Sequence, residues 1–441
     1  MTDRAAIQAA IDDAHRREWA LVLAATARVA GDLDLAEECV QEAYAMALQT
    51  WTRDGIPNNP AAWLTTAARR RAIDTIRRER TFRSKLSLLV QPDDAVEDTA
   101  MHQPLEEDQR YEEYPQDSVP DERLRLIFTC CHPALAAEAQ VALTLRLLCG
   151  VTTRDIAREF LVSESTMAAR ITRAKRKISG ARIPYRVPRS AELPDRLRSV
   201  LGVIHLLFTA GHTAPTGAHL MRADLVERAL HLARMLRDLM PDEPEVRGLL
   251  ALLLVTDARR ATRVDTAGRL IRLEHQDRSR WDRTAMAEAH DLIVAGLRGG
   301  RPGRYLLQAA IASLYAEAPS YDQTDWPQIL ALYDRLLQVW PSPVVALNRT
   351  VPMAMVAGPD AALVEVARLE ADGALSDYQY LPAVKADLLR RLGRTDEAAK
   401  AHQRALDLTA NETERAFLAD QLAEDMAPLT GPGRARLDQP P

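Results

Sequence analysis

Aromatic residues are scarce in this chain and make up only 5% of its 441 residues. Alanine, leucine and arginine are abundant instead, and these residues favour helices over sheets. The composition therefore predicts an all-α fold. Because one hydrophobic core does not organise a chain of this length, we expect about two to four domains.

Cysteine is also rare, and the chain has no long apolar run. Four cysteines do not make a disulfide framework, which indicates a reducing compartment and hence a cytoplasmic location. The first residues, MTDRAAIQAAIDDAHRREW, have no continuous apolar core, so we expect no signal peptide. No segment approaches about 18 uninterrupted apolar residues, so we expect no transmembrane helix and no membrane partner.

The motifs of common enzyme classes are absent as well. We find no phosphate loop, no nucleophile elbow and no paired-carboxylate pattern, which indicates a protein without enzymatic activity and without a cofactor. Cys130, Cys131 and His132 are adjacent and are of the types that ligate zinc. However, neighbouring cysteines on a helix point about 100° apart, and no CxxC spacing is present, so we favour buried packing over a metal or redox site.

Three histidines, His205, His212 and His219, follow one another at intervals of seven residues. The sequence GHTAPTG should break the helix between them, so we do not expect them to share a metal. The segment LLFTAGHTAPTGAHLMRADL is predicted to be a loop between helices that serves as a structural joint.

Positive charge is concentrated in two stretches, although the whole chain has a net charge of −5. Two basic patches predict two separate contacts with a polyanion. Between them lies an acidic stretch, Asp93 to Glu122, which predicts an extended or disordered linker. Such a linker is either simply solvated or runs through a positively charged channel of a partner. The basic residues are Arg69, Arg70, Arg71, Arg77, Arg78, Arg80, Arg83 and Lys85 in the first stretch, and Arg170, Arg173, Lys175, Arg176, Lys177, Arg182, Arg186 and Arg189 in the second.

The second basic stretch overlaps a helix-turn-helix pattern, VTTRDIAREFLVSESTMAARITRAKRKI, at residues 151–178. Thr152 and Asp155 predict the start of its first helix, and Ser163 the start of its second. A hydroxyl and several cations on one face of the second helix suit the reading of a DNA major groove. A plain helical hairpin with a solvated basic face is the alternative. The apolar face consists of Met167, Ile171, Ala174 and Ile178, and the polar face of Thr166, Arg170, Arg173 and Lys177.

The helices of an earlier module are predicted from their ends and their apolar spacing. A first helix ends near Gly31, and a second runs from about Leu35 to Trp51. A third begins at Asn59 and Pro60, a cap residue followed by proline, and carries the arginine cluster on its outer face. Thr52–Asn59 is predicted to be a short polar loop between the second and third helices.

The order of these patterns resembles that of a bacterial RNA polymerase sigma factor of the extracytoplasmic function group. The resemblance covers about residues 10–180. It rests on four features in order: LAEECVQEAYAMALQTW, NPAAWLTTAARRRAIDTIRR, the acidic linker and the helix-turn-helix. It implies a protein that binds the β′ and β subunits of core polymerase, recognises the −10 and −35 promoter elements and promotes transcription initiation. Arg70 stands where many members have asparagine, and Ala168 where many have lysine, so the preferred promoter sequence is left open.

The resemblance assigns a role to each matched segment. Unpaired bases at the −10 element require cations and an apolar surface, and Thr52–Asn59 is expected to form the pocket for a flipped base. Core-polymerase binding is assigned to Ala36, Glu38, Val40, Gln41 and Glu42. Contacts with the −10 element are assigned to Trp63, Arg69, Arg70, Asp74, Arg77 and Arg78. Contacts with the −35 element are assigned to Ser165, Thr166, Ala169, Arg170, Arg173, Arg176 and Lys177.

The chain continues far beyond the helix-turn-helix. Gly358 and Gly393 are 35 residues apart, and each precedes an alanine-rich helix pattern, which resembles a tetratricopeptide repeat. The whole chain resembles the long sigma factors of this group that carry a helical C-terminal extension. The resemblance implies that the extension governs activity, and its repeats offer a surface for a protein or peptide partner. Amphipathic helices are predicted at Leu193–Phe208, Ala223–Met240, Glu245–Val255 and Arg283–Leu297.

Two other functions are consistent with parts of the sequence. One is a DNA-binding transcriptional regulator with a helical sensor domain, and the other is a repeat scaffold with incidental basic helices. The segment Ala36–Trp51 distinguishes a sigma factor from such a regulator, because a repressor that does not bind polymerase does not need it. The predicted domains are a sigma region 2 domain at 10–85, an acidic linker at 86–120, a sigma region 4 helix-turn-helix domain at 121–182, a helical extension domain at 185–300 and tetratricopeptide-like repeats at 301–430.

Overall fold

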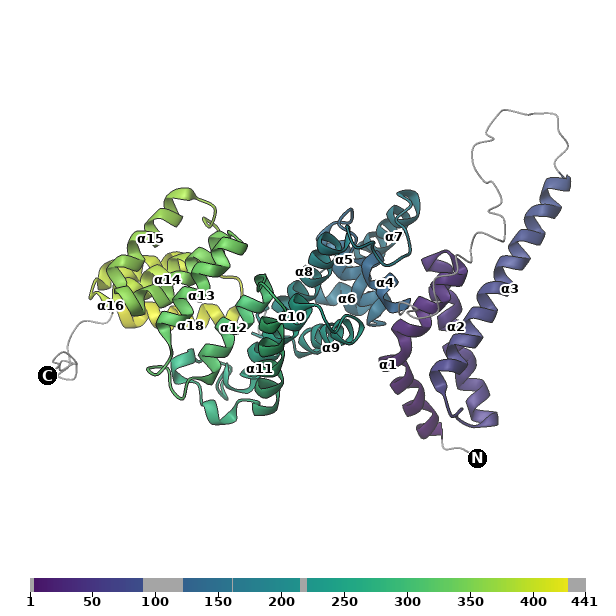
Figure 1. Cartoon of the computed structure of the whole chain (residues 1–441), viewed down its shortest axis with the longest axis horizontal. Coiled ribbons are helices and arrows are strands. Elements are labelled where there is room, and N and C mark those ends of the chain that lie inside the picture. Colours follow the sequence, from purple (N-terminus) through teal and green to yellow (C-terminus); the bar gives the residue numbers. More distant parts are fainter. Residues whose placement is uncertain (1–3, 90–121, 161, 215–219, 427–441) are drawn as a thin grey trace, which may run out of the picture. The chain divides into compact units, whose positions relative to one another are not determined.

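The computed structural model describes residues 4–89, 122–160, 162–214 and 220–426. Across these ranges the regular structure is helical, apart from one isolated bridge between Val264 and Leu270, which confirms the prediction of an all-α fold (Figure 1). None of the described helices combines the length and the apolar character needed to span a membrane. The chain divides into two compact units, residues 1–203 and 204–441.

Three long helices open the first unit: α1 (Arg4–Ala30), α2 (Leu33–Asp54) and α3 (Pro60–Leu89). As predicted, α1 ends at Gly31, which has a φ of +67°, and the side chain of Asn59 accepts a hydrogen bond from the Ala62 amide at the start of α3. The three helices pack on one another through buried side chains, among them Leu23, Trp51 and Leu64.

The loop before α3 is shorter than the predicted Thr52–Asn59. Thr52 donates a hydrogen bond to the Leu48 carbonyl one turn earlier and remains in α2, which continues to Asp54. Gly55, with a φ of +87°, then ends the helix. Only residues 55–59 are therefore available as a loop.

The second half of this unit contains α4 (Glu122–Cys130), α5 (Ala137–Leu143), the π-turn η2 (Thr144–Leu148), α6 (Thr153–Glu159) and α7 (Glu164–Gly180). Both predicted caps of the helix-turn-helix are present. The Thr152 hydroxyl accepts from the Asp155 amide, and the Ser163 hydroxyl accepts from the Thr166 amide, each at 3.1 Å. The predicted acidic linker falls almost entirely on residues 90–121, outside the described residues.

Helix α1 packs against α4 and η2, so the two helical groups form one compact unit. Trp19 donates its indole N–H to the Leu147 carbonyl at 3.1 Å, and Tyr185 donates its hydroxyl to the Ala24 carbonyl at 3.0 Å. Gly150 has a φ of +66°, and a Cβ at this position would lie 2.7 Å from Cε1 of His15. A glycine is therefore required where the two groups meet.

The extension begins with α8 (Leu193–His212), α9 (Ala223–Leu239), α10 (Pro244–Asp257) and α11 (Arg283–Arg298), close to the predicted bounds. The prediction that LLFTAGHTAPTGAHLMRADL is a loop throughout is wrong for its first part, because α8 continues to His212. Phe208 and His212 stack within the helix, and Gly211 approaches Leu225 so closely that a Cβ would lie 2.7 Å from the Leu225 Cβ. Helix packing thus outweighs the local glycine and proline signal.

The remaining helices of the second unit are α12 (Arg304–Glu317), α13 (Trp326–Val339), α14 (Pro343–Ala357), α15 (Pro359–Asp372), α16 (Tyr380–Arg391), α17 (Thr395–Leu408) and α18 (Glu412–Met426). Consecutive helices pack as neighbours, which confirms a C-terminal region of paired helices. Short 3₁₀ turns η3 (Arg260–Thr262), η4 (Leu273–His275) and η5 (Arg278–Arg280) lie between α10 and α11.

Candidate nucleic-acid and polymerase interface

Helix α7 has one buried face and one exposed basic face. Met167, Ile171, Ala174 and Ile178 are buried, as their spacing predicts. All seven residues assigned to the −35 element reach the surface, with only Arg170 half-buried. In the described part of the chain, Arg176 and Lys177 have no ion-pair partner. Their charges are available to a polyanion.

Helix α3 presents a second cationic face. Leu64, Ala68 and Ala72 are fully buried, whereas the residues assigned to the −10 element are exposed, apart from half-buried Trp63. The Trp63 ring packs edge-on against Trp51, with 5.7 Å between the centroids. The exposed residues are Arg69, Arg70, Asp74, Arg77 and Arg78.

The residues assigned to core-polymerase binding divide between the two faces of α2. Ala36 and Val40 are fully buried in the helical bundle, while Glu38 and Gln41 are exposed. Half-buried Glu42 accepts two hydrogen bonds from the Arg71 guanidinium, which hold the pKa of Glu42 below its usual range. Ala36 and Val40 therefore position the helix, and only the other three residues are accessible to a partner.

Glu37, which carries no role in the sequence prediction, is the most highly connected acid of α2. It is 6% exposed, accepts a hydrogen bond from Lys175 of α7 at 2.8 Å and forms an ion pair with Arg146. Lys175 also donates to Asp34 at 2.6 Å. Burial lowers the pKa of Lys175, but Glu37 and Asp34 outweigh this effect and raise the pKa overall. The ammonium group therefore stays charged inside the contact between α2 and α7.

The sequence itself indicates that Lys175 faces inward. Lys175 follows Ile171 by four residues and precedes Ile178 by three, so it belongs to the inward face of α7. The sequence prediction includes Lys175 in the second basic stretch but not among the residues assigned to the −35 element. The structure places it against α2, away from the exposed face of α7.

Cys130, Cys131 and His132 lie at the end of α4. Burial raises the pKa of Cys131 to about 12 and that of Cys130 well above its ordinary value. Cys131 Sγ lies 3.5 Å from the Thr144 hydroxyl, and His132 Nδ1 accepts from the Ala134 amide at 3.1 Å. Cys130 and Cys131 are both buried, so their side chains pack inside the first unit.

His205 and His212 lie on α8, and His219 lies outside the described residues. Burial lowers the pKa of His205 to about 4, and burial together with Arg263 lowers that of His212 to about 3. The His205 ring packs against Tyr305, with 5.5 Å between centroids. Both rings are therefore neutral packing groups at physiological pH.

Comparison with known proteins agrees with this arrangement. Residues 14–82 match the family model "Sigma-70 region 2", residues 125–178 match "Sigma-70, region 4", and residues 196–296 match "Family of unknown function (DUF6596)". A protein of Rhizobium meliloti (strain 1021), named "Uncharacterized protein R00370", is 40% identical over 422 residues, which cover 96% of each chain.

The two matched regions and the basic helix-turn-helix define a promoter-recognition subunit, and the chain belongs to the sigma-70 family of sigma factors. More particularly, it is a sigma factor of the extracytoplasmic function type with an extra helical C-terminal region. It binds core RNA polymerase and promoter DNA and directs transcription initiation, and it is not an enzyme.

Proposed function

We propose that α7 reads the −35 element, that α3 and residues 55–59 hold the unpaired −10 element, and that the exposed face of α2 binds core polymerase. The observation that carries this assignment is the two-faced character of α7. Its apolar residues are buried, and its hydroxyl and basic residues share the opposite, accessible face. A helix of this kind is suited to reading base edges in a major groove.

Run-off transcription tests the assignment. Purified core polymerase is combined with this chain on fragmented genomic DNA, and transcripts are mapped against a reaction without the chain. Discrete start sites that depend on the chain reveal its promoter. DNA binding without any chain-dependent transcript would favour a DNA-binding regulator with a helical sensor domain instead.

The −35 assignment predicts that Arg170→Ala or Arg173→Ala weakens binding of the holoenzyme to its promoter by about 1–3 kcal/mol. A base-edge contact relaxes specificity at one position, whereas a phosphate contact lowers affinity uniformly and reduces the salt dependence. Fluorescence anisotropy at several salt concentrations distinguishes the two. Lys400→Ala, an exposed change in α17, is the control. Wild-type transcription by both arginine variants would show that α7 is misassigned.

The finer architecture is also part of the proposal. We assign region 2 to residues 10–85, the linker to 86–120, region 4 to 121–182 and the extension to 185–300 and 301–430. Gly358 and Gly393, with φ values of +89° and +72°, join α14 to α15 and α16 to α17. Small buried residues such as Ala362 and Ala398 pack these pairs, which supports a tetratricopeptide-like arrangement with a surface for a protein or peptide partner.

The cellular setting follows from the partners. Surface residues of α2 are proposed to contact the β′ subunit of core polymerase, and region 4 the β subunit. Because core polymerase and promoter DNA lie in the bacterial cytoplasm, we place the chain there.

The extension is proposed to control the sigma regions. A cut after Arg189 would remove Arg196, which donates a hydrogen bond to the Phe128 carbonyl within the first unit, so the fragment is better ended at Val203. If the extension holds the sigma regions in a competent arrangement, the 1–203 fragment should lose promoter output by about tenfold or more.

In vitro transcription from the cognate promoter measures this output, and circular dichroism verifies that the fragment is folded. A gain in output would indicate that the extension masks the basic faces. Unchanged output from a folded fragment would show that the extension has no role in this activity.

A further inference from the structure

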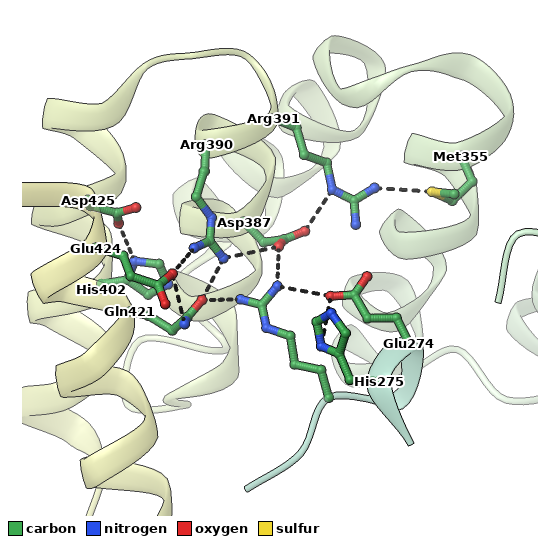
Figure 2. A network of polar contacts seen from close by, with 11 residues as sticks. Glu274, His275, Met355, Asp387, Arg390, Arg391, His402, Gln421, Glu424 and Asp425 are labelled. Carbon is green, nitrogen blue, oxygen red and sulfur yellow. Dashed lines mark hydrogen bonds and ion pairs between the residues drawn. The ribbon is translucent and has the colours of Figure 1, made fainter. Parts of the chain in front are cut away.

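A polar cavity of about 760 Å³ lies in the second unit. Its walls come from the segment 265–275, the end of α16, one face of α18 and Tyr321 with Asp322 between α12 and α13. The volume is in the range of sites for small ligands. Figure 2 shows the polar side chains of α16 and α18 that converge beside it.

Three arginines in this wall share a single central carboxylate. Asp387 lies 2.9 Å from Nε of Arg391, 3.3 Å from Nη1 of Arg272 and 3.7 Å from Nη2 of Arg390. The neutral Gln421 carboxamide accepts hydrogen bonds from Arg272 and Arg390. Arg272 also pairs with Glu274 at 3.6 Å and Arg390 with Glu424 at 3.2 Å, so the three guanidinium groups surround Asp387 and Gln421 with two further carboxylates beside them.

Among the described residues, Asp387 is the one carboxylate paired with Arg391, and the Tyr321 hydroxyl is also hydrogen-bonded to this arginine. Besides Asp387, Arg391 donates from Nη1 to the sulfur of Met355 at 3.1 Å (Figure 2). A thioether is a weak acceptor for a guanidinium. A stronger acceptor in the cavity would therefore be bound in preference to the sulfur.

Besides Asp387 and Glu274, several exposed acids line the cavity. The side chain of Glu424 is 63% exposed, compared with 20% for Arg390, and Asp322 and Asp420 are exposed as well. Asp265 is already bound to Arg269 at 2.8 Å. These exposed carboxylates disfavour an extended polyanion such as nucleic acid and leave room for a small ligand that also carries hydrogen-bond donors.

We propose that this cavity binds the oxyanion of a small polar metabolite, a carboxylate or a phosphate, through Arg391, Arg272 and Arg390. Guanidinium groups match the planar geometry of such oxyanions and bind them with charge-assisted hydrogen bonds. The exposed acids accept hydrogen bonds from the N–H or O–H groups at the other end of the ligand. The inference goes beyond the sigma activity and does not depend on it.

The cavity is lined by residues from two different parts of the extension. Arg272 lies within the segment that matches the family of unknown function, whereas Asp387, Arg390 and Arg391 lie beyond it. A bound oxyanion would contact both parts of the extension at once. The ligand would thereby stabilise one arrangement of the extension.

Isothermal titration calorimetry with the full chain tests the proposal, with inorganic phosphate and succinate as separate probes at a constant ionic strength set with sodium chloride. We expect saturable binding of at least one probe, and the probe that binds identifies the oxyanion. Arg391→Gln should weaken it about tenfold. Arg391→Lys, which keeps the charge but loses the planar fork, should weaken it less.

Arg368→Gln is the matched control, because Arg368 is an exposed arginine of α15 paired with Glu365, away from the cavity. It should bind as the wild type does. Circular dichroism verifies the fold of each variant. Absence of saturable heat with both probes, or equal affinities of the wild type and a folded Arg391→Gln, would overturn the proposal. Because the assay contains no polymerase, its outcome is independent of the promoter assignment.

Discussion

The Glu38→Lys variant is expected to lose its measurable affinity for core RNA polymerase and to remain folded. Glu38 is exposed on α2, and among the described residues it has no ion-pair or hydrogen-bond partner, so its replacement removes no stabilising contact. On the proposed polymerase-binding face, a reversed charge is expected to oppose association, since like charges across an interface cost several kcal/mol. Pull-down of the purified chain with core polymerase, without DNA, measures the effect.

Asp54→Lys provides the control, because Asp54 lies on the same helix about four turns away and is also exposed. It should retain core binding. Charge reversal at both Glu38 and Glu42 should abolish core association too, but it also removes the bidentate pair with Arg71. The single Glu38 variant is therefore the cleaner test. Full core affinity of Glu38→Lys would rule out this face of α2.

The second large effect is a gain in affinity for core polymerase, which we expect when Lys175 is replaced. In the first unit, this residue of the recognition helix α7 is bound to Glu37, the neighbour of Glu38. The proposed polymerase-binding part of α2 and the proposed DNA-reading helix are thus in contact. We therefore expect region 4 and core polymerase to compete for the same segment. Lys175→Met removes the contact and keeps most of the side-chain volume. We expect the contact to weaken by about 1.4 kcal/mol or more, which raises the apparent core affinity about tenfold.

Titration of labelled core polymerase with the variant checks this expectation. Arg146 still neutralises Glu37 in the variant, so the chain should remain folded, with a lower melting temperature. Lys177→Met makes the same change at an exposed position of α7 and should leave core affinity unaltered in the absence of DNA. If Lys175→Met is folded and binds core polymerase no better than the wild type, the contact does not compete with polymerase.

Local patterns predict much of this molecule. Ser163 and the spacing of Met167, Ile171 and Ile178 define the start and both faces of α7, because capping and amphipathic periodicity act within a few residues. The glycines that join the C-terminal helix pairs are predicted for the same reason.

Contacts between distant segments are not visible in such patterns. Lys175 meets Glu37 across 138 positions of the chain, and Arg272 meets Gln421 across 149 positions. Nothing in the local sequence of Glu37 distinguishes a buried acid from a solvated one. The structure locates the residues assigned to promoter and polymerase binding, and binding experiments with promoter DNA and core polymerase test their roles.

The contact at Gly150 has a consequence for how this chain can evolve. Since a Cβ at this position would meet His15, and since the backbone φ is positive, every other L-amino acid adds both a clash and strain. The close contact between the two sigma regions thus depends on a residue that has no Cβ atom. A residue other than glycine at position 150 is therefore expected to loosen the contact between α1 and the segment that follows η2.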